Sequence, residues 1–275
     1  MKTRNFLALL GLLTSFFLFS CGDNAATQNQ EEAPAATNEQ PQPEVASETK
    51  YILTPFSESP AFTDAKIGLK SYKNGKFSFD VSGTDYKLGV QTSDAPQKMC
   101  ANSDKGQHIH LIVDNAPYSA QYTADFDFDV ADGDHYMLSF LSRSYHESIK
   151  TQPAHLLKKI TVANKAITAS EDVKEMMLNY SRPKGTYVGK AETEKVMLDF
   201  YLNNVAIGAN YFVKAEINGE EHVIDTWQPY YITGLPMGDN KIKLTLIDEN
   251  GKAVDAPYNP VERVFTLKED PAEQQ

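Results

Sequence analysis

From about residue 51 onward the chain consists of short stretches in which apolar and polar residues alternate, separated by turn residues. Examples are Lys76 to Val81, which follows Asn74-Gly75, then Tyr86 to Val90, and His108 to Val113. Strict alternation is typical of a half-buried strand, and Asn-Gly favours a tight turn. The sequence therefore predicts a mainly β protein with antiparallel strands.

Parts of this pattern recur at a constant offset of 105 residues. Val130 to Asp134 precedes one strand as Leu235 to Asp239 precedes another, and Lys159 to Val162 corresponds to Val264 to Leu267. We infer a tandem duplication. Units of roughly 85 to 110 residues with short strands and no long helix favour immunoglobulin-like β-sandwiches, with a single larger barrel as the alternative.

The predicted domains are 51–165 and 186–269, joined by a linker over 166–185 and followed by a tail over 270–275. Within the linker we expect a short inter-domain helix over 171–179. Ser170 offers an N-cap hydroxyl, and acidic residues followed by apolar ones come next. Arg182-Pro183-Lys184-Gly185 is expected to end that helix.

The N-terminus has the pattern of a secretory signal: Lys2 and Arg4, an apolar run from Phe6 to Phe19, then Ser20-Cys21. The run has about 14 residues, fewer than the roughly 20 of a membrane helix. Its end resembles the lipobox of bacterial lipoproteins, which implies that Cys21 is lipidated and that 1–21 is signal peptide and lipobox. Ordinary secretion with removal of Cys21 is the alternative.

The segment 22–50 is rich in Ala, Thr, Asn, Gln, Glu and Pro and predicts a disordered tether. Loss of Lys2 and Arg4 with the signal takes the formal net charge from −11 to −13. No basic stripe interrupts this acidic chain, so nucleic acid is not expected as a partner. We expect the protein to be attached to the membrane through the lipid on Cys21. Its expected location is the cell envelope, in particular the outer membrane.

The second unit serves as an internal control for the first. On its strand Tyr211 to Ile217, Phe212, Lys214 and Glu216 point outward, which predicts a solvated face. In the first unit the matching positions are mostly apolar, aromatic or imidazole side chains: His108, His110, Ile112, Tyr136, Leu138 and Phe140. A face of this kind is seldom left open. The 171–179 helix, the second unit, or a ligand or partner could cover it.

Two loops of the first unit also depart from their counterparts. Arg143 to Ser148 replaces the ordinary turn Asp248 to Gly251, and Asp94 to Gly106 is enlarged. Antiparallel pairing places the start of the His108 strand beside the end of the following one, so His108 is expected near His146. His135 lies at the far end of its strand and is therefore excluded from this group of histidines.

The end of the first unit that carries His108 and His146 offers two candidate chemistries. Cys100, His108, His110 and His146, with Met99 and His155 nearby in sequence, offer ligands that suit copper or zinc. Arg143, His146, Lys150 and Arg182 offer donors for a small anion. The candidate ligand-binding residues are therefore His108, His110, Arg143, Tyr145, His146 and Arg182. Packed histidines and paired surface charges are the alternatives, and no cofactor other than copper or zinc is expected.

If Cys21 carries lipid, Cys100 has no disulfide partner, because the chain has two cysteines. Phosphate loops, metalloprotease helices and nucleophile elbows are absent from the sequence. Asp125, Asp127 and Asp129 alternate with phenylalanines and fit the wet side of a strand. We therefore expect a binding or interaction module without catalytic activity, with transition-metal binding as the alternative.

Four segments carry a resemblance to a known family: Gln107 to Asn115, Ser142 to Ser148, Tyr180 to Gly185, and Trp227 to Tyr230. Over about residues 60–268 the chain resembles a family of Bacteroidota lipoproteins, some of whose members are labelled phosphopeptide-binding. The resemblance implies lipid anchoring and two immunoglobulin-like domains, and it implies no established activity. Independently of this resemblance, we expect the partner to be an envelope protein or a small anionic ligand.

Overall fold

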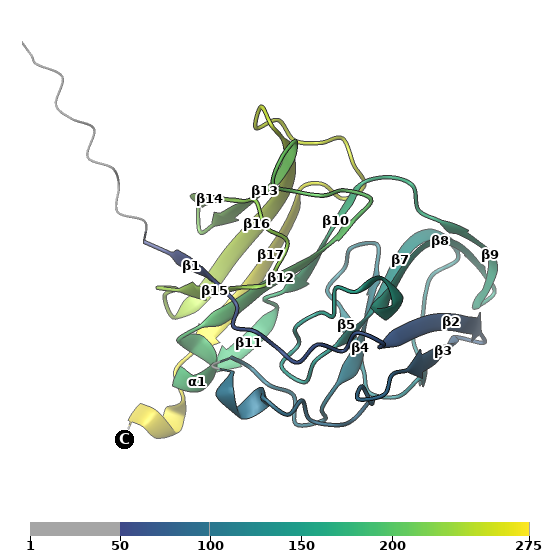
Figure 1. The fold of residues 1–275 in the computed structure, drawn as a ribbon, viewed down its shortest axis with the longest axis horizontal. Helices are drawn as coiled ribbons and strands as arrows, with labels where there is room; N and C mark the ends of the chain where they lie inside the picture. The colour runs from purple at the N-terminus through teal and green to yellow at the C-terminus, as the bar shows by residue number, and fades with distance from the viewer. Residues whose placement is uncertain (1–49, 99, 275) are drawn as a thin grey trace, which may run out of the picture. The chain divides into compact units, whose positions relative to one another are not determined.

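The computed structural model describes residues 50–98 and 100–274, which belong to one compact unit, Ser47–Gln275. The predicted signal peptide, Cys21, the tether up to residue 49 and Met99 lie outside the described residues. Strands dominate and form two β-sandwiches (Figure 1), as the sequence predicted. In the part of the chain that is described, no helix combines the length and apolarity needed to cross a bilayer.

The first sandwich has a three-stranded sheet in the order β2-β3-β6 and a five-stranded sheet in the order β5-β4-β7-β8-β9. Alternation of side chains places Phe77, Ile109, Met137 and Ile160 between the two sheets. Its elements are β2 (Lys66–Lys73), β3 (Lys76–Ser82), η1 (Ala95–Gln97), β4 (His108–Val113), β5 (Ser119–Gln121), β6 (Asp125–Asp127), β7 (Gly133–Ser142), η2 (Gln152–Ala154), β8 (His155–Ala163) and β9 (Ala166–Asp172).

The second sandwich has a four-stranded sheet in the order β1-β15-β12-β10 and a five-stranded sheet in the order β11-β17-β16-β13-β14. Leu198, Phe200, Val213 and Leu244 lie in its core. Its elements are β1 (Ile52–Pro55), β10 (Met177–Arg182), β11 (Gly185–Val188), α1 (Lys190–Thr193), β12 (Val196–Asn203), β13 (Tyr211–Ile217), β14 (Glu220–Ile224), β15 (Tyr230–Thr233), β16 (Gly238–Asp248), β17 (Val261–Lys268) and η3 (Pro271–Gln274).

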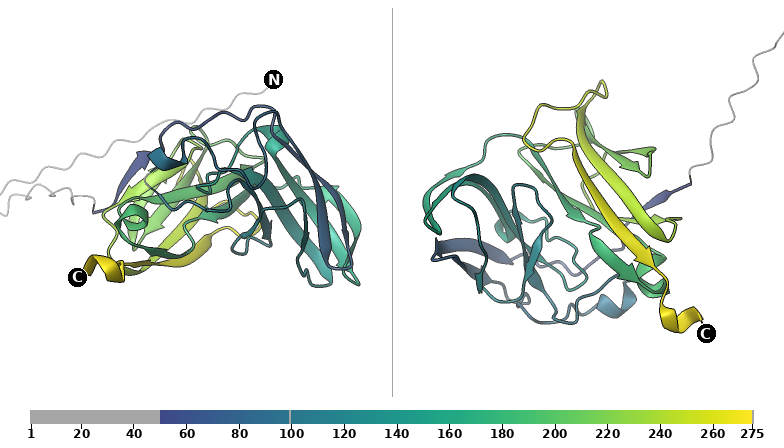
Figure 2. Two further views of the ribbon diagram at one scale, coloured as in Figure 1. Left: turned by 90° about the horizontal axis from the view of Figure 1, so that it is seen from below. Right: turned by 180° about the vertical axis from the view of Figure 1, so that it is seen from behind.

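The predicted duplication is visible in the strand order. The series β5-β4-β7-β8 in the first sandwich corresponds to β14-β13-β16-β17 in the second. Each series carries an isolated bridge after its long strand, Ser142 to Ser148 and Ile247 to Ala253, at the offset of 105 residues. The two copies therefore share the order of these four strands and the place of the bridge, and Figure 2 shows both from further sides.

The predicted helix over 171–179 is wrong, and so are the linker bounds around it. Residues 166–172 form β9, which pairs with β8, and residues 177–182 form β10, which pairs with β12. Every residue of β10 is buried, so its apolar positions follow two-sided burial in a sheet rather than one helical face. Tertiary pairing overrides the local capping signal.

Two further boundaries differ from the prediction. β1 precedes the first sandwich in the chain but pairs with β15 of the second, so the first domain does not begin at residue 51. Residues 86–90 are not a strand, since Gly89 turns the backbone at a φ of 76° and donates to Gln107 O. The Tyr86 ring is buried there, and its hydroxyl donates to the His108 and Ser142 carbonyls.

The second sandwich covers the apolar outer face of β4 and β7. The second unit was one of the alternatives that the sequence allowed for this role. Phe140 stacks on Tyr201 of β12 with ring centroids 5.0 Å apart, and Tyr201 meets Trp227 edge-on. Asn115 donates to Leu178 O and accepts from Tyr180 N, both on β10. The matching outer face of the second copy is solvated, with Lys243 and Glu216 paired at 2.8 Å.

Candidate functional site

The strand β4 presents two histidines on the face opposite the first core. Ile109 and Leu111 point between the sheets, and alternation sends His108 and His110 to the other side. Both imidazoles are fully buried. The register pairs His108 with Ser142 at the end of β7, which brings the loop after β7 alongside the two histidines.

That loop delivers the third histidine. Arg143 N donates to Glu147 O and His146 N to Arg143 O, so the segment forms a tight turn closed by the bridge between Ser142 and Ser148. His146 has a φ of 69°, in the left-handed region, and Gly251 at the offset of 105 residues has a φ of 77°. A histidine thus stands where the sister copy uses glycine, a conformation that costs a side chain free energy.

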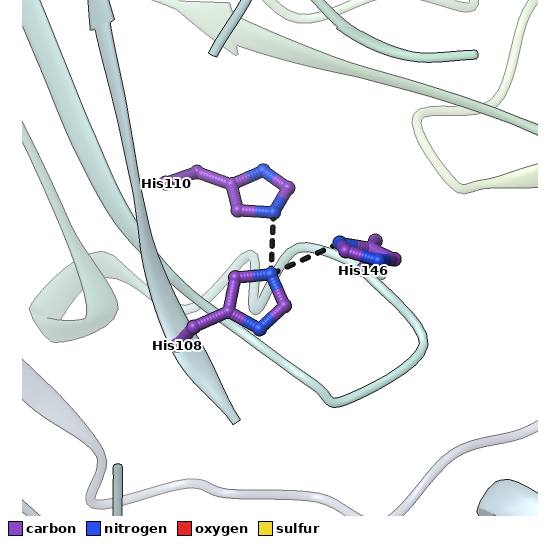
Figure 3. A group of neighbouring side chains, drawn as sticks. All are labelled: His108, His110 and His146. Carbon is purple, nitrogen blue, oxygen red and sulfur yellow. Dashed lines mark hydrogen bonds between the residues drawn. The ribbon is translucent and has the colours of Figure 1, made fainter. Parts of the chain in front are cut away.

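The three imidazoles converge on one atom (Figure 3). His108 Nε2 lies 2.8 Å from His110 Nε2 and 3.0 Å from His146 Nδ1. One ligating nitrogen from each ring falls within 4.8 Å of the others. His108 and His110 are buried, and His146 is half-buried.

A backbone contact fixes the proton of His108. Its Nδ1 lies 2.8 Å from Gly106 O, and a carbonyl can only accept, so Nδ1 carries the hydrogen. The lone pair of His108 Nε2 is then directed at the other two rings. A metal-ligating histidine usually donates its second ring nitrogen to a carbonyl or carboxylate in this way.

All three imidazoles are held neutral near pH 7. Burial, and then the positive charge of Arg182, lower the pKa of His108 to about 4, against the opposing hydrogen bond to Gly106. Burial lowers the pKa of His110 and of His146 well below the usual value, with further lowering by neighbouring histidines, Arg182 and Lys184. Neutral imidazole is the form that ligates a metal.

A tyrosine and two cations complete the surroundings. The Tyr118 ring stacks on His110 with centroids 3.7 Å apart and 6° between planes, and its hydroxyl lies 3.4 Å from His146 Nδ1. Arg182 of β10 donates to Tyr118 Oη at 2.7 Å, and Lys184 Nζ lies 4.0 Å from the centre of the Tyr118 ring. The second sandwich therefore reaches the cluster through Tyr118.

Arg182 is a buried cation whose contacts are aromatic and phenolic. Burial acts to lower the pKa of its guanidinium, but Tyr118 and Tyr187 more than offset that and raise it. Its charge faces Tyr118, the Tyr187 ring and the region of Cys100, with no carboxylate among the groups that shift it. Its Nε is buried without a hydrogen-bond partner among the described residues.

Cys100 does not join the histidines, so its predicted place in the metal site is wrong. The free thiol is buried against Phe56, Ala95 and Tyr145, in an apolar cluster that belongs to the contact between the sandwiches. Burial raises the pKa of the thiol to about 12. The ligand group found among the described residues consists of His108, His110 and His146.

The predicted anion donors are not gathered into one site. Arg143 pairs with Glu147 at 3.4 Å and donates to Pro60 O, while Lys150 pairs with Asp199 at 2.6 Å. Tyr145 is buried and donates to the Asp94 carboxylate at 3.1 Å. Of the four cationic candidates, His146 belongs to the cluster and Arg182 approaches it, and the two are joined through Tyr118.

The other two histidines of the first unit lie elsewhere. His155 packs on Tyr201 and its Nδ1 faces Thr151 O, so it stays outside the cluster. His135 contacts the Asp114 carboxylate at 2.6 Å at the far end of β7, as the strand geometry predicted. The sequence therefore predicted the three histidines that cluster in the structure. It also included Cys100, which lies elsewhere.

Sequence reasoning missed Tyr118 and the closeness of Lys184. The connection from β4 to β5 runs from Asp114 to Tyr118, whereas the matching connection between β13 and β14 is the two-residue turn Asn218-Gly219. That difference in length was the available signal. Lys184 follows the end of β10, in a stretch that had been predicted to terminate a helix.

No protein-family model matches the chain, and no curated protein matches it either. Solved structures give weak likenesses. The fibronectin(III)-like modules of CbhA from Clostridium thermocellum match at 17% identity over 34% of this chain and 99% of that chain, with a TM-score of 0.27. The central fibronectin-III array of RIM-binding protein matches at 10% identity over 79% and 72%, with a TM-score of 0.25. The FN1–FN3 domains of chicken CNTN1 match at 9% identity over 74% and 66%, also with a TM-score of 0.25. The assignment of two sandwiches therefore rests on the sheets themselves.

Proposed function

We propose that this protein is a lipid-anchored, non-catalytic binding module of the bacterial cell envelope, and that His108, His110 and His146 bind one copper or zinc ion. One observation carries the metal site: the ring nitrogens of His110 and His146 lie 2.8 and 3.0 Å from His108 Nε2. Imidazole suits both copper and zinc. Neighbouring donors of one four-coordinate ion are about 2.8 to 3.3 Å apart at metal–nitrogen bonds of about 2.0 Å, and both contacts fall in this range.

Three further features support a cation at this place. The lowered pKa values keep the three histidines uncharged at neutral pH, and neutral imidazole is the form that ligates a metal. The contact of His108 Nδ1 with Gly106 O orients the ring before any ion arrives. His146 keeps a left-handed φ that its glycine counterpart adopts without cost, which favours a role for the imidazole itself.

Calorimetric titration of the mature chain with Cu(II), Cu(I) and Zn(II) tests the metal site. We expect one ion per chain with a Kd tighter than about 1 μM for at least one of these ions. His108→Ala and His110→Ala are expected to abolish this binding. His222→Ala, at a half-buried histidine of β14 in the other copy, is the matched control and should bind like the unmodified chain. Binding that survives His108→Ala contradicts the proposal.

The anchor is proposed from the sequence, because Cys21 lies outside the described residues. We expect cells that express the full chain to attach labelled palmitate to it, and Cys21→Ser to remove the label. Release of an unlabelled, shortened chain from the unmodified protein would support ordinary secretion instead. The resemblance to Bacteroidota lipoproteins agrees with the anchor and adds no ligand to the proposal.

A further inference from the structure

We propose that Tyr118 is the fourth ligand of this site, so that the cluster binds Cu(II) through three imidazole nitrogens and one phenolate oxygen. The inference rests on the proposed metal site and names both its missing ligand and its preferred ion. Tyr118 lies outside the histidine group and belongs to the connection between β4 and β5.

Tyr118 is already placed for this role. Its hydroxyl oxygen lies 3.4 Å from His146 Nδ1, one of the converging nitrogens. The parallel stack on His110, with 6° between the ring planes, holds the tyrosine beside the second ligand. The side chain is 3% exposed, so few other positions are open to it.

The spacing of the donors favours a tetragonal ion. Four donors at about 2.0 Å from a metal are about 2.8 Å from their neighbours in a square and about 3.3 Å apart in a tetrahedron. Along the series His110, His108, His146, Tyr118 the successive distances are 2.8, 3.0 and 3.4 Å. The two contacts between imidazoles are close to the edge of the square, whereas the contact of Tyr118 with His146 is close to the edge of the tetrahedron, so the preference for a tetragonal ion rests on the imidazoles. Tetragonal coordination by nitrogen and oxygen is typical of Cu(II), whereas zinc prefers a tetrahedron.

The charges around Tyr118 match a phenolate. Arg182 donates to its oxygen at 2.7 Å and Lys184 lies over its ring, and both cations stand beside a site whose other ligands are neutral. When Cu(II) binds, the phenol O–H bond breaks, an O–Cu bond forms and the proton passes to the buffer. The new negative charge then offsets part of the charge of the ion and of Arg182. This gives the buried guanidinium an anionic partner.

Visible absorption of the mature protein with one equivalent of Cu(II) tests the inference. We expect a phenolate-to-copper charge-transfer band, which three imidazoles alone do not produce, and ring vibrations of tyrosinate in resonance Raman spectra excited in that band. Tyr118→Phe is expected to lose the band and about tenfold or more in Cu(II) affinity while still binding through the histidines. The Raman measurement needs no variant and therefore holds even if Tyr118→Phe folds poorly.

Tyr122→Phe is the matched control. The Tyr122 ring lies 5.0 Å from that of His108, but its hydroxyl is hydrogen-bonded to Ser103 Oγ at 2.7 Å, so this variant should keep the band. Histidine-dependent Cu(II) binding without the band overturns the role of Tyr118 and leaves the three-histidine site intact. Absence of metal binding overturns both proposals. A band lost in Tyr122→Phe and kept in Tyr118→Phe also contradicts the assignment.

Discussion

His146 shows how a single backbone position separates stability from binding. Its φ of 69° suits glycine, and the corresponding residue of the second copy is Gly251. A left-handed conformation costs a residue with a side chain about 1 kcal/mol or more. The first copy keeps the histidine in spite of this cost, which fits a side chain retained for the ion.

We therefore expect His146→Gly to be more stable than His146→Ala by about 1 kcal/mol in the metal-free protein. Both variants lose the imidazole, so both should lose tight metal binding. Urea denaturation gives the free energies of unfolding, and calorimetry gives the metal affinities. Equal stability of the two variants would show that the turn does not strain the side chain.

The buried histidines also set a pH dependence. The pKa of His108 in the folded protein is about 4, below the ordinary value of about 6.5, so the unfolded chain binds more protons between these pH values. The free energy of unfolding must then fall as the pH drops from about 6.5 toward 4, by up to about 1.4 kcal/mol per pH unit from this group. Urea denaturation of the metal-free protein at several pH values in this range measures this dependence. The free energy of unfolding should depend less steeply on pH in His108→Gln than in the unmodified protein, and equal dependence would contradict the assignment.

At the scale of elements, β1 belongs to a sandwich that follows it by more than a hundred residues in the chain. It pairs with β15, and the adjoining Tyr51 is 5% exposed in the core of the second sandwich. Backbone nitrogens of Lys50 and Tyr51 donate to the Glu220 carboxylate at the start of β14. The N-terminal end of the described chain thus fastens the second sandwich.

Tyr51→Ala is expected to destabilise the protein by about 3 kcal/mol or more, because it empties a large buried site. Ile52→Ala is the control: its side chain is 54% exposed, and the change should stay within about 0.5 kcal/mol. Midpoints and slopes of urea unfolding measure both. A Tyr51→Ala effect as small as that of Ile52→Ala would remove β1 from the second core.

The strands of the repeat could be predicted from sequence, because alternation and turn residues are local signals that recur at a fixed offset. β4 and β7 show these signals, and their antiparallel register allowed the contact between His108 and His146 to be predicted. β10 could not be predicted, since its burial on both faces depends on the partner sandwich. Tyr118 and Cys100 were placed by loop conformations and packing between sandwiches, for which alternation carries no signal.

At the scale of the whole molecule, the two sandwiches are joined by buried contacts near the site. Asp199 of β12 is fully buried and binds Lys150 Nζ at 2.6 Å and the Ser148 amide at 3.0 Å. Ser148 closes the turn that carries His146. The contact between sandwiches therefore supports the loop that supplies the third histidine.

Asp199→Asn should destabilise the protein by about 3 kcal/mol, because it leaves the Lys150 charge without its buried partner. The exposed pair of Lys158 and Asp172 has the same 2.6 Å separation, and Asp172→Asn should cost no more than about 1 kcal/mol. Fluorescence of Trp227, the single tryptophan, and far-ultraviolet circular dichroism should report one shared transition. Two separate transitions would show that the sandwiches unfold independently.

In the proposed site, three imidazoles hold one metal ion. X-ray absorption at the copper edge, on the protein loaded with one equivalent of Cu(II), counts these ligands directly through the outer-shell scattering of the imidazole rings. We predict scattering from the three rings of His108, His110 and His146 around a single ion, with no sulfur neighbour. A first shell with sulfur, or scattering from fewer than three imidazoles, would contradict this site.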